Sequence, residues 1–434
     1  MLAPRSHPPS EADGPGRPRG GAVVLVALAC AAALLTGCTG KGPLASAAPS
    51  AAAMRVGHGV TGDRITVAAL TDLSGPYAPL GKGVTQAQKL YFDRLNAAGG
   101  VCGRKVELIV RDHGYDVRRA VAAYSEVAPR SAAIAQVIGS PITNALRPRL
   151  ESAGVLTVPQ AWAHTLLGSK YIQVVGTTYD LDMINGVAFL TEEKGLRRGD
   201  AIGHLFLDGD YGHSALAGSR WAARQAGLRL IEQRVKAADG DMSAQAAAFR
   251  RAGVKAILVS VSPPQAASLV GAAAAQGLDV PFVAGNSAFA EQLLKSPIGP
   301  ALEKNYFVLS AGAPMSADIP GVKALARDYR RAYRGQPLDS GVLSGYMAAA
   351  IVGQALKKAC AMRDLSREGI VAAHRSTHAF DAGLGGPPQN YTQWTRPGSR
   401  ASYVLRPDRD ALGGLTIHRE PFESTLAKSY DPPL

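Results

Sequence analysis

The chain has 434 residues, a formal net charge of +13 and a hydrophobic content of 47%. The hydrophobic content excludes a disordered chain, and the length suits two folded lobes better than one small core. The arginines are scattered, without a long basic run or a basic strand interleaved with aromatic residues, so the charge does not indicate a nucleic-acid partner.

The N-terminal segment, residues 1–37, has the pattern of a lipoprotein signal peptide. An arginine-bearing stretch precedes 14 consecutive apolar residues, 22–35, fewer than the about 20 that span a membrane. The following Leu-Thr-Gly-Cys sequence resembles a bacterial lipobox, in which Cys38 is lipidated and becomes the mature N-terminus. An ordinary signal peptide with an incidental cysteine is the alternative. We expect a flexible tether over residues 38–60 and an extracytoplasmic body anchored to the cell membrane by lipid.

From residue 64 onward, short β-branched runs alternate with helical patterns. The predicted strands are 65–70, 106–111, 133–138, 155–158, 171–175, 202–208, 228–235, 256–261, 281–284 and 306–310. The predicted helices are 82–96, 142–152, 181–193, 214–226, 243–251, 265–276, 322–333 and 341–361. A repeated order of strand and helix predicts βαβ units and parallel sheets.

The number of strands is too large for one comfortable sheet, so we predict an α/β fold with two doubly wound parallel-sheet lobes. We expect residues 387–434 to form a tail of strand-like segments that returns to the lobes. In such sheets a ligand is expected where the carboxyl ends of strands meet helix N-termini.

The cysteines also allow a prediction about disulfide bonding. Once the signal peptide and the lipid site are set aside, Cys102 and Cys360 remain as an even pair in an oxidising compartment. This favours a disulfide, and two separate buried thiols are the alternative. No cluster of His, Cys and Asp has the spacing of metal ligands, so we expect no metal and no cofactor.

The motifs of common enzymes on such folds are incomplete. No phosphate-binding G-x-x-x-x-G-K-[ST] loop occurs, and the sequence at 81–86 is only a fragment of a dinucleotide fingerprint. The sequence at 285–289 resembles a nucleophile elbow, but its fifth residue is Phe289 instead of glycine. We therefore expect no enzymatic activity.

Loops at the ends of the predicted strands carry aromatic and hydroxyl side chains, which is typical of a small-molecule site without a reaction centre. These candidate ligand-binding residues are Tyr77, Ser140, Thr143, Trp162, Tyr211 and Ser262. Thr143 stands near a predicted helix start, where its hydroxyl and the backbone N–H groups would face an anionic ligand group. A plain helix cap is the alternative role for Thr143.

Several segments together resemble the extracytoplasmic solute-binding proteins of the branched-chain amino acid, amide and urea uptake type of ATP-driven transporter. They are ITVAALTDLSGPYAPLGKG, LNAAGGVCGRKVELIVRDHGYD, the loop 139–144, DGDYGHSALAG, and DGDMSAQAAAFRRAGVKAILVSVSPPQAASLVGAAAAQGLDVPFVA. The resemblance covers about residues 64–386. It implies the type I periplasmic-binding-protein fold, in which three crossovers join two α/β lobes and a hinge closes them on a ligand. With that connectivity, the first lobe would comprise residues 61–177 and 312–386, and the second would comprise residues 178–311.

The resemblance also implies roles for single residues. It places Thr143 where the family usually has a ligand-binding serine, and Tyr211 at the aromatic position of the second lobe. Trp162 and Ala163 stand where amino-acid binders often have a small residue and a hydroxyl residue. Asn286 stands near the position of the acidic residue that binds the ligand's ammonium group in amino-acid binders.

Two departures from that pattern bear on the ligand. Ala163 lacks the hydroxyl and Asn286 lacks the carboxylate, and a buried ammonium group without an anionic partner is costly. We therefore expect a bulkier or less cationic solute than leucine, stacked on Trp162. Packing within the lobe core is the alternative for Trp162, and packing beside the hinge is the alternative for Tyr211. The resemblance also places Cys102 and Cys360 in the first lobe, where a bridge would not block closure.

The resemblance implies a monomeric, lipid-anchored receptor that captures a small molecule and delivers it to the permease of an ABC importer. A sensor subunit of the same fold, which signals to a membrane receptor or kinase, is the main competing hypothesis. The sequence also allows a secreted enzyme on a doubly wound fold, or a family member that binds little.

Overall fold

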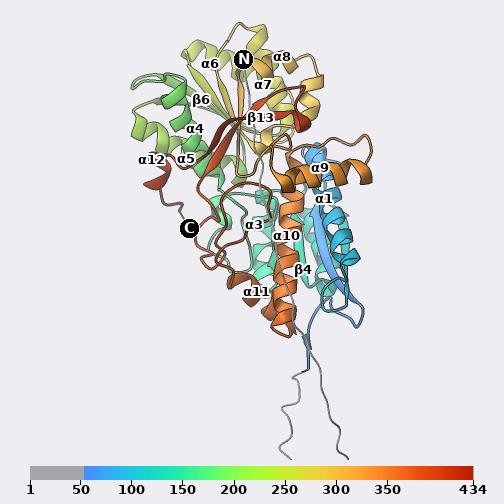
Figure 1. The fold of residues 1–434 in the computed structure, drawn as a ribbon. Coiled ribbons are helices and arrows are strands. Elements are labelled where there is room, and N and C mark those ends of the chain that lie inside the picture. Colours follow the sequence, from blue (N-terminus) through green and yellow to red (C-terminus); the bar gives the residue numbers. More distant parts are fainter. Residues whose placement is uncertain (1–52, 434) are drawn as a thin grey trace, which may run out of the picture. The chain divides into compact units, whose positions relative to one another are not determined.

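The computed structural model describes residues 53–433, drawn in colour in Figure 1. The predicted signal peptide, Cys38 and most of the predicted tether lie outside these residues. Between residues 53 and 433, no helix combines the length and the apolar character that a membrane crossing requires.

A first sheet of four parallel strands has the order β3-β2-β4-β5. Its strands are β2 (Arg64–Thr71), β3 (Lys105–Asp112), β4 (Ala133–Val137) and β5 (Leu156–Thr157). The helices that accompany it are α1 (Ala78–Ala97), α2 (Val117–Val127), α3 (Ser140–Ser152), α9 (Pro320–Ala332), α10 (Ser340–Ala361) and α11 (Arg367–Arg375). A short parallel pair joins β1 (Arg55–Val56) to β11 (Asp364–Leu365). We call this assembly the first lobe.

The alternation of side chains along β2 explains why helices cover both faces of the first sheet. Ile65 and Val67 are buried in the apolar cluster that holds residues of α1 and α10. Ala68 and Leu70 are buried in the cluster that holds residues of α2 and α3. Because successive side chains of a strand point to opposite faces, a nearly continuous apolar strand needs a helical layer on each side.

A second sheet has seven strands in the order β13-β12-β10-β9-β8-β6-β7. The parallel strands are β6 (Ala201–Leu207), β7 (Arg229–Val235), β8 (Ala256–Ser260), β9 (Phe282–Gly285) and β10 (Tyr306–Ser310). The antiparallel strands are β12 (Ser402–Pro407) and β13 (Leu415–Phe422). The helices of this second lobe are α4 (Tyr179–Glu193), α5 (Asp210–Ala226), α6 (Ser243–Ala252), α7 (Pro263–Ala275), α8 (Gly299–Asn305) and α12 (Thr425–Lys428).

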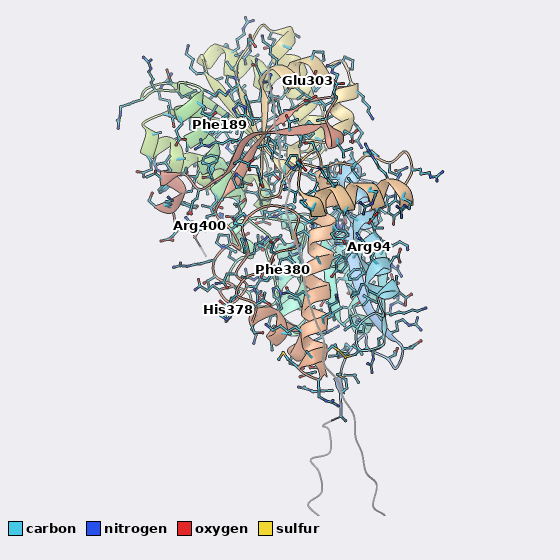
Figure 2. The ribbon with its side chains drawn as sticks, in the orientation of Figure 1. Arg94, Phe189, Glu303, His378, Phe380 and Arg400 are labelled. Carbon is cyan, nitrogen blue, oxygen red and sulfur yellow. A yellow bond between two sulfur atoms is a disulfide. The ribbon has the colours of Figure 1, made fainter. Side chains whose placement is uncertain are left out.

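Three crossovers connect the two lobes. The chain passes between them after β5, after β10 and after α11. After the third crossover, β12 pairs with β10, and the rest of the chain stays with the second lobe. Arg400 holds this segment: its Nε donates to Glu423 at 2.7 Å, and the guanidinium also donates to the carbonyl of Tyr430 at 2.6 Å (Figure 2).

Contacts between helices and one covalent bond tie the first lobe together. Arg94 of α1 lies 3.1 Å from the carboxylate of Asp328 on α9 and donates to the Tyr346 hydroxyl of α10 at 3.2 Å (Figure 2). A disulfide joins Cys102, just before β3, to Cys360 at the end of α10, with the two Cα atoms 5.9 Å apart. The disulfide therefore lies within the first lobe.

The predicted α/β class with parallel sheets is confirmed, but the predicted strand over residues 171–175 is wrong. This segment makes a single bridge, from Ile172 to Thr157. The carbonyl of Ile172 accepts a hydrogen bond from Arg375 at 2.9 Å. The carbonyl of Val175 accepts one from the Trp162 indole at 2.7 Å. Side chains thus satisfy the backbone groups that a neighbouring strand would otherwise pair with.

Seven of the eight predicted helices begin earlier than their apolar patterns predicted, and three of these early starts bear on the site. α1 begins at Ala78 instead of residue 82, α3 at Ser140 instead of 142, and α5 at Asp210 instead of 214. Before α1, the Asp72 carboxylate accepts the backbone N–H groups of Gly75 and Tyr77, which fixes the turn into the helix. The early starts place Tyr77, Ser140 and Tyr211 at the first turns of their helices.

Candidate ligand-binding site

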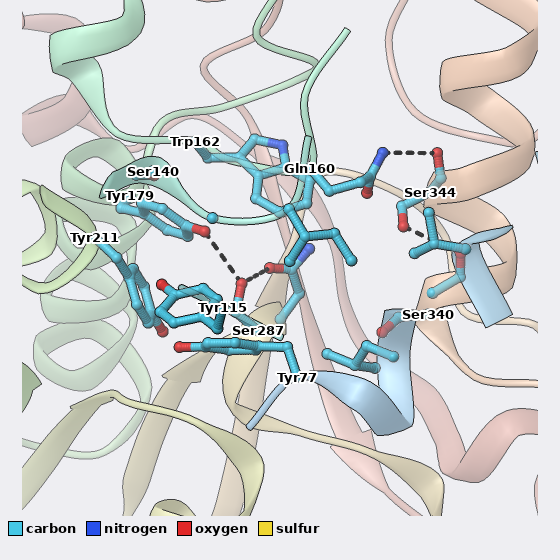
Figure 3. A pocket seen from close by; sticks show the side chains of 16 residues that line it. Tyr77, Tyr115, Ser140, Gln160, Trp162, Tyr179, Tyr211, Ser287, Ser340 and Ser344 are labelled. Carbon is cyan, nitrogen blue, oxygen red and sulfur yellow. Dashed lines mark hydrogen bonds between the residues drawn. The ribbon is translucent and has the colours of Figure 1, made fainter. Parts of the chain in front are cut away.

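A cavity between the two lobes has about 510 Å³ of empty space, its opening included. Helix N-termini and strand-end loops of both lobes form its wall (Figure 3). The lining residues are Tyr77, Leu80, Val84, Tyr115, Ile138, Gly139, Ser140, Gln160, Trp162, Tyr179, Tyr211, Asn286, Ser287, Ser340, Gly341 and Ser344. No Asp, Glu, Lys or Arg is among these described lining residues, so the site is uncharged.

Four tyrosines and one tryptophan form an aromatic wall on one side of the cavity. The ring centroids of Tyr77 and Tyr115, both from the first lobe, lie 4.7 Å apart. Those of Tyr179 and Tyr211, both from the second lobe, lie 4.3 Å apart. Trp162 packs edge-on against Tyr179 with 5.9 Å between the centroids. The aromatic wall therefore spans the junction between the lobes.

Local backbone geometry orients Tyr115. This residue has a left-handed φ of 63°, and its N–H donates to His113 Nδ1 at 3.0 Å. Gly139, whose φ is 100°, stands opposite, and a Cβ at that position would lie only 2.5 Å from the Tyr115 ring. Glycine is thus required at residue 139, both for its backbone conformation and for the close approach of the ring.

The hydroxyls of Tyr77 and Tyr211 are buried, and neither makes a hydrogen bond of acceptable geometry among the described residues, although the Tyr115 hydroxyl interacts with that of Tyr77. Burial raises the pKa of both phenols well above the ordinary value, and neighbouring tyrosines raise it further. Both side chains are therefore protonated donors at neutral pH. Because an unpaired buried hydroxyl is costly, the presence of two such groups on residues that line one cavity is an argument for an acceptor supplied by a ligand.

Ser140 adds a third hydroxyl to the cavity. It is the first residue of α3, is fully buried, and accepts the Ala163 N–H at 3.3 Å. That bond uses a lone pair of the oxygen and leaves the hydroxyl proton for a ligand. The N-terminus of α3 adds a partial positive charge, which favours a negatively charged or electron-rich ligand atom.

On the other side of the cavity, Gln160, Asn286 and the serines of α10 are the polar groups. Gln160 Nε2 donates weakly to the Ser344 carbonyl at 3.4 Å, and its Oε1 is unpaired among residues 53–433. Asn286 Oδ1 accepts from Ser287 at 3.2 Å, and Ser287 bonds in turn to the Tyr179 hydroxyl at 3.2 Å. These neutral groups give this side adaptable hydrogen bonding without charge.

The buried carboxylate at the N-cap of α10 does not line the cavity. Asp339 is the N-cap of α10 and accepts the Gly341 N–H at 3.0 Å. Its side chain is directed towards Gly83 of α1, where a Cβ would lie 3.1 Å from Oδ1. Burial, together with a smaller contribution from the Glu291 carboxylate, raises the pKa of this carboxyl to about 7. Asp339 Oδ2 is also buried without a partner among the described residues, but Asp339 does not line the cavity, so it does not meet a ligand's ammonium group there.

Five of the eight candidate ligand-binding residues from the sequence line the cavity: Tyr77, Ser140, Trp162, Tyr211 and Asn286.

The structure places Thr143, Ala163 and Ser262 away from the cavity lining. The hydroxyl of Thr143 donates to the Gly139 carbonyl at 2.9 Å, so it serves the helix start. Ala163 supports Ser140 through its backbone. Ser262 forms a capping box with Gln265 at the start of α7.

Other lining residues were not predicted from the sequence. Tyr115 follows the predicted strand 106–111, so the rule that found Tyr77 could also have found it. Tyr179 and Ser340 begin helices that follow a crossover or a long loop, without a predicted strand directly before them. Nothing in the local pattern of those two segments marks a site.

Comparisons with known proteins agree with this geometry. The sequence profile of the periplasmic binding protein family matches residues 64–411. A solved structure, a fatty acid ABC transporter substrate-binding protein from Thermomonospora curvata, is 50% identical with a TM-score of 0.87, and the match covers 88% of this chain and 98% of that one. A branched-chain amino acid ABC transporter protein from Thermus thermophilus with bound valine is 20% identical with a TM-score of 0.76, covering 86% and 99% of the two chains.

A curated relative from Pseudomonas aeruginosa, the leucine-, isoleucine-, valine-, threonine- and alanine-binding protein, is 24% identical over 309 residues, which is 70% of this chain and 80% of that relative. The family match covers most of the chain, and the sheets, the crossovers and the site between the lobes agree with it. The chain therefore belongs to the periplasmic binding protein family, has its type I fold, and is a substrate-binding protein of the ABC-transporter class.

Proposed function

We propose that this protein captures a monocarboxylic acid with an apolar body, of the fatty-acid type, and delivers it to an ABC importer. The observation that carries the proposal is the pair of buried, unpaired hydroxyls of Tyr77 and Tyr211, in a cavity that has no charged residue among its described lining. The carboxylate head accepts hydrogen bonds at this end, and the apolar body lies against Leu80, Val84 and Ile138.

The chemistry of the donors favours a carboxylate over other head groups. A carboxylate carries two oxygens, which together accept from the two tyrosine hydroxyls and from Ser140. Hydrogen bonds to a charged acceptor are about twice as strong as neutral ones, and several of them offset the burial of the charge. The N-terminus of α3 acts in the same direction.

An α-amino acid fits the cavity less well. Its ammonium group would be buried in a site whose described lining residues include no carboxylate, and such an unpaired charge is expensive. Asn286, which stands near the family's acidic position, presents a neutral amide. The 50% identical relative is named a fatty acid ABC transporter substrate-binding protein, which supports the same preference.

The proposed cellular setting rests on the sequence and on the family. The lipobox-like segment supports a lipid anchor at Cys38, and the family supports an extracytoplasmic body that meets a permease in the membrane. Uptake of a labelled fatty acid by cells with and without the gene separates import from the alternative sensor role. Loss of uptake supports import, and unchanged uptake with a lost transcriptional response to the acid supports sensing.

The test of ligand class uses compounds that share one chain length and differ in their head group, with leucine as the amino-acid comparison. The purified full chain is titrated with decanoate, decanol, decylamine and leucine at pH 7, by calorimetry and by thermal unfolding. We expect decanoate at 100 times its dissociation constant to stabilise the protein by about 2.7 kcal/mol. Decanol should bind more weakly, and decylamine and leucine should not bind. Binding of leucine without binding of decanoate would overturn the proposal.

A further inference from the structure

A second cavity adjoins the ligand-binding cavity on the side away from the tyrosines. It has about 670 Å³ of empty space, its opening included. Five residues line both cavities, and they are Gln160, Trp162, Asn286, Ser340 and Ser344. Only the side chains of this shared wall separate the two spaces.

One part of the second cavity wall is apolar. Leu343 and Met347 of α10, Met315 of the second crossover, and Leu405 and Leu415 of β12 and β13 form this part, whereas Ser310, Gln389 and the shared wall add neutral polar groups. No charged side chain is among the described residues that line it. A polar solute gains little binding free energy against apolar side chains, whereas methylene groups gain free energy by leaving water.

We propose that this second cavity is an annex that holds the distal methylenes of a long-chain acid whose carboxylate stays with Tyr77 and Tyr211. This inference rests on the proposed function and adds the part of the molecule that selects chain length. The C-terminal strands β12 and β13 then serve the site as well as the second sheet.

The arrangement of the lining residues sets the direction of the ligand. The four tyrosines and Ser140 line only the first cavity, whereas Gln160, Ser340 and Ser344 line both. Figure 3 shows these two groups on opposite sides of the cavity. A carboxylate held at the tyrosine side therefore directs its chain towards the shared wall.

One residue of the shared wall is able to move. Trp162 is fixed by the hydrogen bond from its indole N–H to the Val175 carbonyl at 2.7 Å. Asn286 is only partly buried, and among the described residues its side chain is held by the 3.2 Å bond from its neighbour Ser287. A rotation of the Asn286 amide opens the passage without disturbing the tryptophan.

The annex wall tolerates chains of different shape. Met315 and Met347 are unbranched and have three rotatable bonds, so they adapt to irregular apolar ligands. The backbone at 311–313 carries only small residues, and it runs so close to α10 that a Cβ on Gly312 would lie 2.6 Å from Leu343 Cδ2. The space is therefore bounded by one fixed wall and one adaptable wall.

The test measures affinity against chain length. The full chain is titrated with saturated acids from hexanoate to hexadecanoate, each below its micelle concentration. Each methylene that enters the annex should tighten binding roughly fourfold, until the annex is full. The variant Met347→Trp fills the annex. It should weaken the affinity for hexadecanoate at least tenfold and change the affinity for hexanoate by less than twofold.

The control and the second variant keep the outcome interpretable. Met362→Trp places the same side chain at the exposed end of α10, where Met362 is 49% exposed, and should change neither affinity. If Met347→Trp does not fold, Leu343→Phe narrows the same wall and should give the same length-dependent loss. The annex proposal fails if the affinity is independent of chain length, or if the variant loses equal affinity for short and long acids. The proposed function stands in both cases. Failure of every acid to bind the native protein would overturn both.

Discussion

Replacing Tyr211 with Phe removes a single oxygen atom, and two opposite effects should follow. The hydroxyl is buried, its residue is 3% exposed, and it has no partner within residues 53–433. An unpaired buried hydroxyl costs about 1–3 kcal/mol of stability. We therefore expect Tyr211→Phe to raise the free energy of unfolding of the ligand-free protein by about 1 kcal/mol.

The same variant should bind the acid more weakly. A hydrogen bond to a charged acceptor is worth about 1.5–3 kcal/mol, and 1.4 kcal/mol corresponds to a factor of ten in affinity. The dissociation constant for decanoate should therefore rise about ten- to hundredfold. Urea unfolding of the ligand-free protein measures the first effect, and calorimetric titration of the same preparation measures the second.

Tyr306 supplies the matched control. Its hydroxyl is also buried, but it donates to the Ala288 carbonyl at 3.0 Å, and Tyr306 does not line the cavity. Tyr306→Phe should therefore lower the free energy of unfolding by about 1 kcal/mol and leave the affinity unchanged. If Tyr211→Phe behaves like this control in both measurements, the hydroxyl serves the fold and the argument from unpaired donors fails.

Three further predictions concern stability. Serine at Cys102 and Cys360 should lower the free energy of unfolding in urea by about 2–5 kcal/mol and leave the affinity unchanged, since the disulfide does not line the cavity. Arg367→Met should cost about 3 kcal/mol in the same assay, because the 7% exposed arginine donates to the carbonyls of Ser131 and Ala153 at two helix ends. Burial raises the pKa of Asp339 to about 7 from 3.8, so the unfolded chain releases this proton first as the pH rises. This group therefore lowers stability progressively between about pH 4 and 7, and Asp339→Asn should remove that part of the decline.

The contradicting outcomes differ for the three. A double-serine variant as stable as the native protein would show that the disulfide adds nothing. An Arg367→Met variant within about 0.5 kcal/mol of the native protein would show that water replaces the guanidinium. The Asp339 argument fails if the stability difference between native and variant protein stays constant from pH 4 to 7.

Much of the fold was predictable because it follows from local periodicity. Strands such as β2 and β6 are almost continuously apolar, and the helices between them carry apolar stripes, so the alternation of parallel strands and helices can be read from the chain. The exception at residues 171–175 has a non-local cause. Its β-branched residues favour a strand, but Arg375, about two hundred residues away, takes one of its carbonyls. No local pattern reveals such a partner.

The residues of the site also fall into two groups, those that the local sequence predicts and those that it does not. Tyr77, Ser140 and Tyr211 follow predicted strands, so the rule that ligands gather at strand ends was enough to find them. Tyr179 and Ser340 reach the cavity because the crossovers bring separate segments together, and the sequence does not encode that locally. Thr143 had the right residue type and position, but its hydroxyl turned to the Gly139 carbonyl of its own helix start. A choice between a ligand and a backbone acceptor depends on geometry alone.

The unpaired hydroxyls also bear on how the ligand acts on the lobes. Tyr77 belongs to the first lobe and Tyr211 to the second, so a carboxylate that accepts from both is held completely only when the lobes are together. A ligand shifts a conformational equilibrium only by its difference in affinity for the two states. We infer that the head group supplies that difference, because the chain packs against apolar surface whose burial is less specific. An acid should therefore favour the closed form more strongly than an alcohol of equal length, even at equal occupancy, and a permease that recognises the closed form would distinguish the two.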